Sequence, residues 1–365
     1  MNSSPLLNPE AVHQFHSGSA YGDAVTNSLF FTRKLLRNLG FQSEIYVEHI
    51  AREFSTELMS YKEYVPSLKQ ALLIHHSFGH NLTDWLVSLP DRKILVYHNI
   101  TPEHFFPQGS IARIFIQNGR KQLKLFRTMV DAAICVSRFN AEELKTLGYN
   151  NVFIVPLLLD IQRIRSSPWN YHNPFVRDNV FTVLFVGRIS ANKCQHHVIE
   201  VFRCLLPTIS KPARLLLVGG FDKNDPYYLY IKKQIDSYGL SEYINVIGKV
   251  SDQDLYSLYR IADVFLCMSE HEGFCVPLIE AMLFDVPVIA YSSTNIPYTL
   301  DGAGILVMEK NFQHIAELIN RLDKNNDFRN DILEGQKKRI NDFLPPLIQA
   351  DLLKALKYAG IDNSL

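Results

Sequence analysis

Two carboxylates stand eight residues apart in the sharpest motif of the sequence, at Glu272 and Glu280. The loop that follows Glu272 consists of Gly273, Phe274, Cys275 and Val276. Pro277 suits the first turn of a helix, because the N–H group that proline lacks would be unpaired there. The loop amides would then point from a helix N-terminus toward a bound anion. Glu280, one turn into that helix, could accept hydrogen bonds from two ribose hydroxyls. The alternative is that Glu280 complements the helix dipole and Glu272 is a solvated loop residue.

A second group of candidate ligands follows an apolar run that ends at Gly187. Arg188 and Lys193 come next, five residues apart, and together they suit a diphosphate. The guanidinium group of Arg188 can bind paired phosphate oxygens, and the ammonium group of Lys193 is a compact point charge. Both would leave the C-terminal edge of a strand, where open α/β sheets bind ligands. Taken alone, this spacing is also compatible with two solvated cations.

Two weaker candidates lie in the first half of the sequence. Gly22 belongs to the glycine-bearing loop Ser17–Asp23, which would let backbone approach a phosphate closely, although a tight turn explains it equally well. His98 ends an apolar run and could donate a hydrogen bond to a sugar hydroxyl. A lone histidine is more often structural.

Two further stretches have both a functional and a structural interpretation. Asp252 and Asp254 are spaced like acids that hold manganese, but Ser251 precedes them and apolar residues follow at helical spacing, so we interpret them as a capped first helical turn. We therefore expect no metal ion and no cofactor. Residues 111–129 mix basic and apolar side chains, which fits a helix on an anionic membrane or an ordinary solvated helix face.

The elements that position these residues follow from hydrophobic periodicity. Short apolar runs alternate with stretches of helical spacing, which is typical of parallel sheets covered by helices on both faces. The predicted strands are 12–16, 44–47, 71–75, 93–98, 132–136, 152–155, 182–186, 214–218, 244–247, 264–267, 287–290 and 304–307. A helix at Asp23–Leu39 completes the first βαβ unit. The predicted class is α/β, with two Rossmann-like doubly wound domains.

The length of 365 residues exceeds what one core supports, so two domains are expected. The polar stretch Ile161–Asn179, with two prolines, predicts the connection between them. We therefore predict domains at 1–165 and 166–340, and a helical segment at 341–365 that could pack back on the first domain.

The composition excludes several classes of partner. Lys+Arg and Asp+Glu both number 37, which argues against a nucleic-acid partner. Five cysteines without metal-ligand spacing favour a reducing compartment. No apolar run approaches the roughly 18 residues of a membrane span, and the N-terminus does not look like a leader. We expect a cytoplasmic protein, with peripheral contact at the inner face of the plasma membrane left open.

Six short motifs in the second half resemble, in order and spacing, the retaining glycosyltransferases of family 4. They are Val186–Arg188 with Lys193, Leu217–Gly220, Ile247–Gly248, Ala262–Val264, Glu272–Glu280 and Val286–Ala290. The N-terminal half agrees more loosely, around Gly22 and His98. The resemblance implies a GT-B fold whose second domain binds a nucleotide-sugar donor and whose first binds a glycan or lipid-linked acceptor. Catalysis would take place in the cleft between them, without metal and with retention of configuration.

The resemblance also implies roles for the individual residues. Arg188 and Lys193 would neutralise the diphosphate, Glu280 would hold the ribose, and Glu272 would contact the transferred sugar. His98 would face the donor sugar, and the loop of Gly22 would close over the phosphates. The remaining donor-binding positions would be Gly187, Gly248, Gly273, Phe274, Cys275 and Val276.

The stretch His98–Pro102 looks like that of bacterial mannosyltransferases that build polysaccharides. GDP-mannose is therefore the favoured donor, and the expected enzyme is a hexosyltransferase of polysaccharide assembly. Cys275 stands where the family commonly has a glycine, and its side chain could narrow the donor pocket, so the donor stays open. A UDP-sugar transferase, a nucleotide-sugar 2-epimerase and a non-catalytic partner that binds nucleotide sugars remain alternatives.

Overall fold

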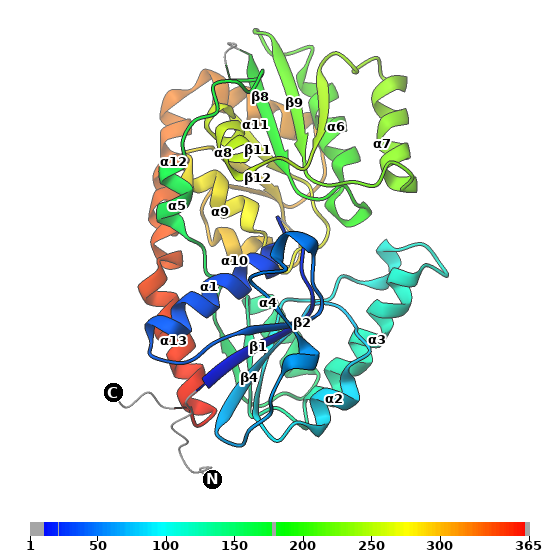
Figure 1. Cartoon of the computed structure of the whole chain (residues 1–365). Helices are drawn as coiled ribbons and strands as arrows, with labels where there is room; N and C mark the ends of the chain where they lie inside the picture. The colour runs from blue at the N-terminus through cyan, green and yellow to red at the C-terminus, as the bar shows by residue number, and fades with distance from the viewer. Residues whose placement is uncertain (1–10, 21, 177–179, 362–365) are drawn as a thin grey trace. The chain divides into compact units, whose positions relative to one another are not determined.

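The computed structural model describes residues 11–20, 22–176 and 180–361, and the chain forms two compact units (Figure 1). The N-terminal unit consists of residues 1–159 and 343–365, and the C-terminal unit of residues 160–342. The predicted connection Ile161–Asn179 is not irregular throughout, because its first residues form helix α5, Ile161–Ser166, capped by Asp160. Residues 177–179 of that stretch, and Tyr21 of the predicted loop Ser17–Asp23, lie outside the described residues.

The N-terminal unit is built on a parallel sheet of seven strands in the order β3-β2-β1-β4-β5-β6-β7. The strands are β1 Ala11–Gly18, β2 Ile45–His49, β3 Met59–Ser60, β4 Gln70–His76, β5 Arg92–Tyr97, β6 Ala132–Cys135 and β7 Val152–Ile154. Its helices are α1 Ala24–Asn38, α2 Thr83–Ser88, α3 Ile111–Phe126, α4 Arg138–Thr146 and α13 Pro345–Tyr358, with 3-10 turns at Arg52–Phe54, Tyr61–Glu63 and Glu103–Phe105.

The closing helix α13 packs on the N-terminal unit. Its buried residues Ile348, Leu352 and Leu356 join a core cluster with Val12 of β1 and Leu36 of α1. A second, separate cluster of the same unit gathers large side chains such as Phe15, Tyr97 and Phe126. The N-terminal unit is therefore completed by the last described part of the chain.

The C-terminal unit is built on a second parallel sheet, of six strands in the order β10-β9-β8-β11-β12-β13. The strands are β8 Phe181–Val186, β9 Ala213–Val218, β10 Ile244–Gly248, β11 Val264–Cys267, β12 Val288–Tyr291 and β13 Ile305–Val307. The chain starts in the middle, winds to one edge and then returns to the other, as in doubly wound Rossmann folds. Its strand order therefore reverses between β8 and β11, which is where such folds bind ligands.

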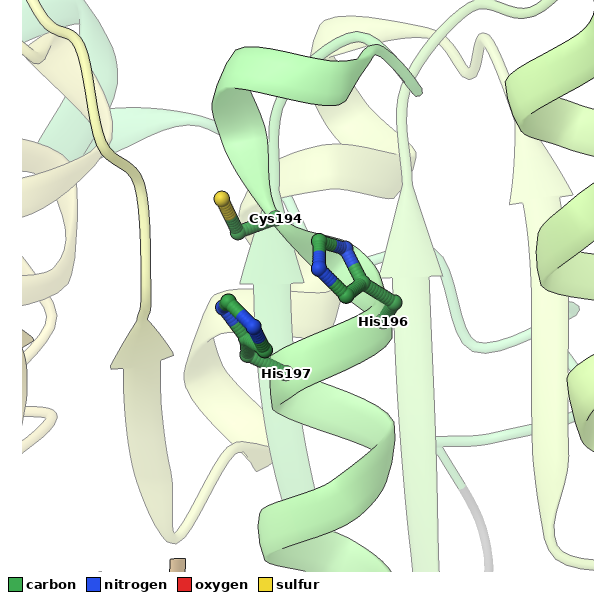
Figure 2. Close-up of side chains that lie close together, drawn as sticks. All are labelled: Cys194, His196 and His197. Atoms are coloured by element: carbon green, nitrogen blue, oxygen red, sulfur yellow. The ribbon is translucent and has the colours of Figure 1, made fainter. Parts of the chain in front are cut away.

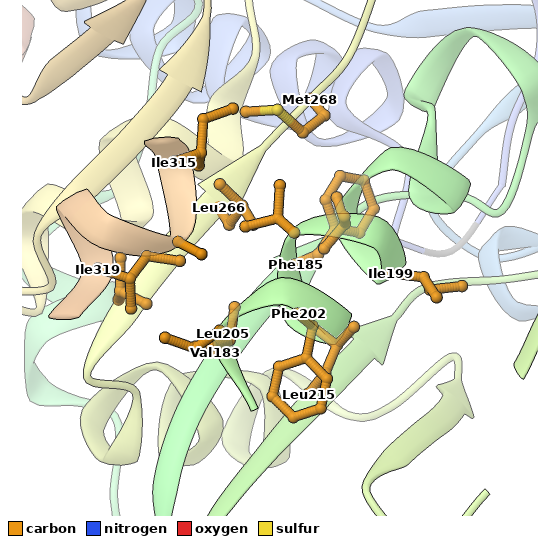
Figure 3. Close-up of a cluster of buried hydrophobic side chains, with 14 of the residues drawn as sticks. Val183, Phe185, Ile199, Phe202, Leu205, Leu215, Leu266, Met268, Ile315 and Ile319 are labelled. Carbon is orange, nitrogen blue, oxygen red and sulfur yellow. The ribbon is translucent and has the colours of Figure 1, made fainter. Parts of the chain in front are cut away.

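Helices and a large apolar core support this second sheet. The helices are α5, α6 Gln195–Leu205, α7 Pro226–Ser237, α8 Asp252–Ile261, α9 Val276–Leu283, α10 Ile296–Leu300, α11 Phe312–Lys324 and α12 Asn326–Ile340, with 3-10 turns at Ala191–Lys193 and Asn341–Phe343. Figure 3 shows part of the core, in which Phe185 of β8, Phe202 of α6, Leu266 of β11 and Ile319 of α11 are fully buried.

Each predicted strand overlaps a strand of the structure, and the α/β class is confirmed. The two-residue strand β3 and helix α5 were not expected. No helix in the described part of the chain combines the length and the apolar character that crossing a bilayer requires.

Candidate functional site

Lys193 and Glu272 meet at the point where the strand order of the C-terminal sheet reverses. Strands β8 and β11 pair in parallel, so the loops that leave their carboxyl ends share one edge of the sheet. Lys193 follows β8 and Glu272 follows β11, and Lys193 Nζ donates a hydrogen bond of 2.6 Å to Glu272 Oε2. The two side chains are largely shielded from solvent, with 22% and 7% of their surface exposed.

The contact with Glu272 favours the charged form of Lys193. Burial alone would lower the pKa of Lys193, but the negative charge of Glu272 and the hydrogen bond between the two outweigh it, and the pKa is raised. Lys193 is therefore a cation at neutral pH. A diphosphate that binds Lys193 must compete with a carboxylate already in contact with it.

The loop that carries Glu272 is tied down on both sides. The amide of Glu272 donates to Thr294 Oγ1 at 2.9 Å, and the Thr294 hydroxyl lies 3.0 Å from the Glu272 carbonyl oxygen. Asn192 donates to the carbonyl oxygen of His271 at 3.2 Å and accepts from the amide of Glu270 at 2.8 Å. Hydrogen bonds thus join the loop that follows β8 to the loop that follows β11. Sequence reasoning missed Asn192 and Thr294, which carry no motif of their own.

The loop after β8 brings backbone and a free cation to the same edge. Gly187 approaches the next loop so closely that a Cβ atom on Gly219 would lie 2.2 Å from the Gly187 carbonyl oxygen. Gly219 also has a φ of 143°, which favours glycine. The side chain of Arg188 is exposed, and its guanidinium group forms no hydrogen bond or ion pair with any residue that the structure describes. Arg188 is therefore available to a ligand.

Gly248 ends β10 beside these loops. The amide of Gly219 donates to its carbonyl oxygen at 2.9 Å, and its φ is 85°. A Cβ atom on Gly248 would touch the ring of Phe221 at 3.4 Å. The predicted positions Gly187 and Gly248 thus follow β8 and end β10, on either side of the loop that begins at Gly219.

Helix α9 begins where the sequence predicted, with Pro277 in its first turn. The preceding residue, Cys275, has a φ of 68° and a ψ of 64°, a left-handed conformation that glycine adopts without strain. Phe274 is held through its carbonyl oxygen, which accepts a 2.6 Å hydrogen bond from the Thr299 hydroxyl. Gly273 and Phe274 precede Cys275 in the loop, and Val276 is the first residue of α9.

Glu280 lies one turn into α9 and is buried. The hydroxyl of Tyr259 on α8 donates to Glu280 Oε2 at 2.9 Å. Burial raises the pKa of Glu280 to about 7, against the lowering effect of the Tyr259 hydrogen bond. Sequence reasoning did not single out Tyr259, because a tyrosine at helical spacing among apolar residues reads as core.

Two clusters of side chains in this unit have the composition of metal ligands. Cys267, Glu272 and Cys275 place their ligand atoms within 4.8 Å of one another, and all three residues are buried. The hydrogen bond with Cys267, together with burial, raises the pKa of the Cys275 thiol well above its ordinary value. Because Glu272 already pairs with Lys193, an ion here would have to displace that contact.

The other cluster surrounds the first turn of α6, where Figure 2 shows Cys194, His196 and His197. Lys310 Nζ lies 2.8 Å from His197 Nδ1 and 2.6 Å from Glu270 Oε1. Burial raises the pKa of the Cys194 thiol to about 11. A cation of the protein thus already stands at this cluster, and a metal ion would have to replace it.

Asp252 and Asp254 occupy the first turn of α8, as the sequence predicted. The Ser251 side chain caps the helix by accepting from the amide of Asp254 at 3.1 Å. Asp254 also accepts hydrogen bonds from Asn170 and Asn173. Asp252 pairs with Arg163 of α5, with 2.5 Å between Nη2 and Oδ2, so both acids have structural partners.

The predicted residues Gly22 and His98 belong to the N-terminal unit. Gly22 precedes α1 with a φ of 70°, and the next residue, Asp23, caps the helix. His98 follows β5 and is buried, with its Nε2 atom 2.8 Å from Nδ1 of His75. Burial, and then the charges of His16 and His76, lower the pKa of His98 to about 3. Its imidazole is therefore neutral at physiological pH.

Residues 170–339, nearly all of the C-terminal unit, match the family model of the glycosyl transferases group 1. The C-terminal unit belongs to that family. The match covers the loops of Arg188, Lys193 and Glu272 and the helix of Glu280.

Three curated relatives from bacteria show what the chain is similar to. The Staphylococcus aureus capsular polysaccharide biosynthesis glycosyltransferase CapM is 30% identical over 58% of the chain and 54% of its own length. A GDP-mannose:cellobiosyl-diphosphopolyprenol alpha-mannosyltransferase of Xanthomonas campestris is 30% identical over 39% and 37%. The Escherichia coli O-antigen chain mannosyltransferase B is 30% identical over 34% and 32%. The chain thus spans about half the length, or less, of the curated relatives it matches.

Solved structures extend the likeness to nearly the whole chain. HepE from Anabaena, in complex with UDP and glucose, has a TM-score of 0.75 at 18% identity, covering 95% of this chain and 99% of that one. WaaG, a glycosyltransferase involved in lipopolysaccharide biosynthesis, has a TM-score of 0.70 at 12% identity with the same coverage. At these identities the likeness concerns the fold, and the chain has the two-unit GT-B fold.

Proposed function

We propose that the chain is a metal-independent, retaining glycosyltransferase that transfers a hexose from a nucleoside diphosphate to a glycan or lipid-linked acceptor in bacterial polysaccharide assembly. The observation that carries the proposal is the ion pair of Lys193 and Glu272 at the reversal point of the C-terminal sheet. Arg188 is exposed in the loop that carries Lys193, and Glu280 lies one turn into the helix that follows the loop of Glu272. Membership of the C-terminal unit in the glycosyl transferases group 1 supports it.

The chemistry requires that a nucleoside diphosphate leaves an anomeric carbon. Negative charge develops on the leaving phosphate, and preorganised positive groups that meet it supply a large part of catalysis. Arg188 offers an exposed and unpaired guanidinium group, and Lys193 offers an ammonium group whose raised pKa keeps it charged. These two residues would stabilise the leaving group without a metal ion.

Glu272 has a second task in this proposal. Lys193 holds its carboxylate in place, and the Thr294 contacts fix its backbone. When a diphosphate takes over Lys193, the carboxylate becomes free to accept hydrogen bonds from hydroxyls of the donor sugar. We assign no general base to a side chain, since with retention the acceptor can attack on the face of the leaving group, whose phosphate takes the proton.

GDP-mannose is the donor we propose first. Two of the relatives described above are mannosyltransferases, one of them named for GDP-mannose, which supports this choice. The solved structure of HepE holds UDP and glucose, so a UDP-sugar is the second candidate. Cys275 stands at the start of α9 in a conformation that glycine favours, and its side chain adds bulk there. This bulk would influence which of the two donors fits.

The first test is thermal unfolding with GDP, UDP and ADP at matched concentrations, each with and without EDTA. A ligand that binds only the folded state adds RT ln(1 + [L]/Kd), about 2.7 kcal/mol at a hundredfold excess over Kd. We expect a chelator-insensitive rise in Tm with GDP. A rise with UDP alone would replace the donor, and a rise that EDTA abolishes would contradict metal independence. If no nucleotide stabilised the protein, the donor site itself would be refuted.

A product analysis separates transfer from the remaining alternatives. Incubation of the protein with GDP-mannose alone should leave the donor sugar unconverted, whereas a 2-epimerase would change its configuration. Adding lipid-linked or mannose-containing acceptors should then release GDP. Binding of GDP without turnover on any acceptor would favour a non-catalytic partner.

We also propose that α3 brings the enzyme to an anionic membrane and so to a lipid-linked acceptor. Its side chains Ile111 and Ile114 are 73% and 59% exposed, and Lys121 and Lys124 are exposed on the same helix. Such a helix can lie on anionic lipid. Flotation with anionic vesicles should carry the protein upward and fail for Lys121→Glu/Lys124→Glu. The matched control, Lys232→Glu/Lys233→Glu on α7, should still float, and wild-type protein left at the bottom would refute the contact.

A further inference from the structure

The hydroxyl of Tyr259 is held at one place inside the C-terminal unit. Its ring is fully buried and stacks on Phe284 and on Phe265, with ring centroids 5.7 and 6.0 Å away. The hydroxyl lies 2.9 Å from Glu280 Oε2 and 3.3 Å from the carbonyl oxygen of Pro277. It has one proton to donate, and the shorter distance and the carboxylate acceptor assign that proton to Glu280.

This contact leaves the other half of the Glu280 carboxylate open. Among the residues that the structure describes, Tyr259 alone forms a hydrogen bond to this side chain. The Tyr259 bond takes one lone pair of Oε2, and Oε1 keeps both of its own. The remaining acceptor sites of this carboxylate suit a pair of neighbouring hydroxyls, such as those of a ribose.

The contact also bears on the charge of Glu280. Burial opposes ionisation, the hydrogen bond from Tyr259 favours it, and the charge of Asp252 on α8 opposes it weakly. Asp252 is itself paired with Arg163 on α5, with 2.5 Å between Nη2 and Oδ2. With a pKa of about 7, Glu280 changes charge in the neutral range, where the loss of one hydrogen bond alters its ionised fraction strongly.

We propose that Tyr259 is a positioning residue of the donor site, which turns the Glu280 carboxylate toward the ribose of the nucleotide and keeps it ionised for that contact. The inference rests on the proposed function, because it takes Glu280 as the ribose ligand. It adds that nucleotide affinity depends on pH through Glu280 and that Tyr259 sets the midpoint of this dependence. Tyr259 itself does not touch the nucleotide.

The test is calorimetric titration with GDP and UDP between pH 6 and pH 9, on wild type, Tyr259→Phe and Tyr256→Phe. Tyr256 is the matched control, since it lies one turn earlier on α8 against the same Phe284 ring. A lost hydrogen bond to a charged group predicts about tenfold weaker binding for Tyr259→Phe at pH 7. We expect the affinity ratio of this variant to wild type to recover partly toward pH 9, and that of Tyr256→Phe to stay near one. Titration of the diphosphate is common to all three and cancels in these ratios.

The outcomes separate the two proposals. If wild type binds neither nucleotide, the proposed function fails and takes this inference with it. If wild type binds and the ratio for Tyr259→Phe is the same at every pH, only the inference is overturned. The pH dependence of Tm without ligand gives a second readout, in which Tyr259→Phe must move the Glu280 midpoint to higher pH. An unmoved midpoint would also refute the role.

Discussion

Arg188 and Lys193 are both basic and only five residues apart, yet they differ in how much they contribute to the stability of the fold. Arg188 is exposed and forms no ion pair among the described residues, so removing it costs the folded protein little. Lys193 neutralises a buried carboxylate, so removing it leaves Glu272 without its cation. The same sequence pattern therefore contains one residue that the fold does not require and one that supports the fold.

The variants Arg188→Ala and Lys193→Ala should separate these two roles. Both should weaken GDP binding. Only Lys193→Ala should lower the free energy of unfolding, by about 2 kcal/mol, because a buried carboxylate loses its partner. Urea unfolding and calorimetric titration of both variants provide the measurement. Equal stability losses in the two would contradict the assignment.

Glu280 should give the protein a pH-dependent stability that a neutral residue would not. Its pKa in the folded state is about 7, against an ordinary value of 4.5, so the folded state binds more protons between these values. Stability is therefore lost as pH rises through this window, by up to about 3 kcal/mol. Glu280→Gln should be more stable than wild type at pH 8 and similar to it at pH 5, as thermal unfolding at both values can show. It should also lose nucleotide binding. A stability difference independent of pH would contradict the shift.

The site was foreseeable from sequence only where residues stand in a local pattern. Arg188, Lys193, Glu272 and Glu280 follow apolar runs at short spacing, and their family resemblance could be recognised. Tyr259 contacts a residue 21 positions away, and a sequence pattern does not show which residues so far apart will meet in the fold. The pairing of Lys193 with Glu272, 79 positions apart, was hidden for the same reason.

At the scale of elements, helices α6 and α9 begin in an unusual way. Each is preceded by a cysteine in left-handed conformation, Cys194 with a φ of 51° and Cys275 with a φ of 68°. This conformation costs roughly 1–2 kcal/mol for a residue with a Cβ atom. The two helices that flank the candidate site thus start from strained residues where glycine would fit without strain.

Cys275→Gly and Cys275→Ala form a matched pair that measures this strain. Both lose the thiol, but only glycine relieves the conformation, so Cys275→Gly should be about 1 kcal/mol more stable than Cys275→Ala in urea unfolding. The glycine variant should also accept GDP and UDP with a smaller difference in affinity if the side chain narrows the donor pocket. Equal stability of the two variants would show that the start of α9 is unstrained.

Strands were easier to predict than their exact surroundings. The buried parallel strands read as continuous apolar runs, such as Val264–Cys267, and their existence follows from that alone. Strand β3 has two residues and only half-buried side chains, so it leaves no hydrophobic signal. Helix α5 lies in the stretch for which the sequence predicts a connection, because the polar and proline-containing residues after the helix outweigh its own short helical pattern.

At the scale of the whole molecule, each unit has its own core, and α13 belongs to that of the N-terminal unit. Leu352→Ala should therefore destabilise one unit selectively, by about 2–4 kcal/mol for a buried leucine. Calorimetric unfolding should show one transition moved to lower temperature, while the transition that GDP raises stays in place. A uniform shift of both transitions would contradict this independence.

The chain leaves the N-terminal unit after Leu159 and returns to it only at Phe343. During synthesis from the N-terminus, the core of this unit therefore lacks the apolar residues of α13 until the whole C-terminal unit has been translated. The C-terminal unit is continuous and can fold first, while the earlier segment stays exposed to aggregation and to chaperones. The unit whose synthesis begins first thus completes its core last.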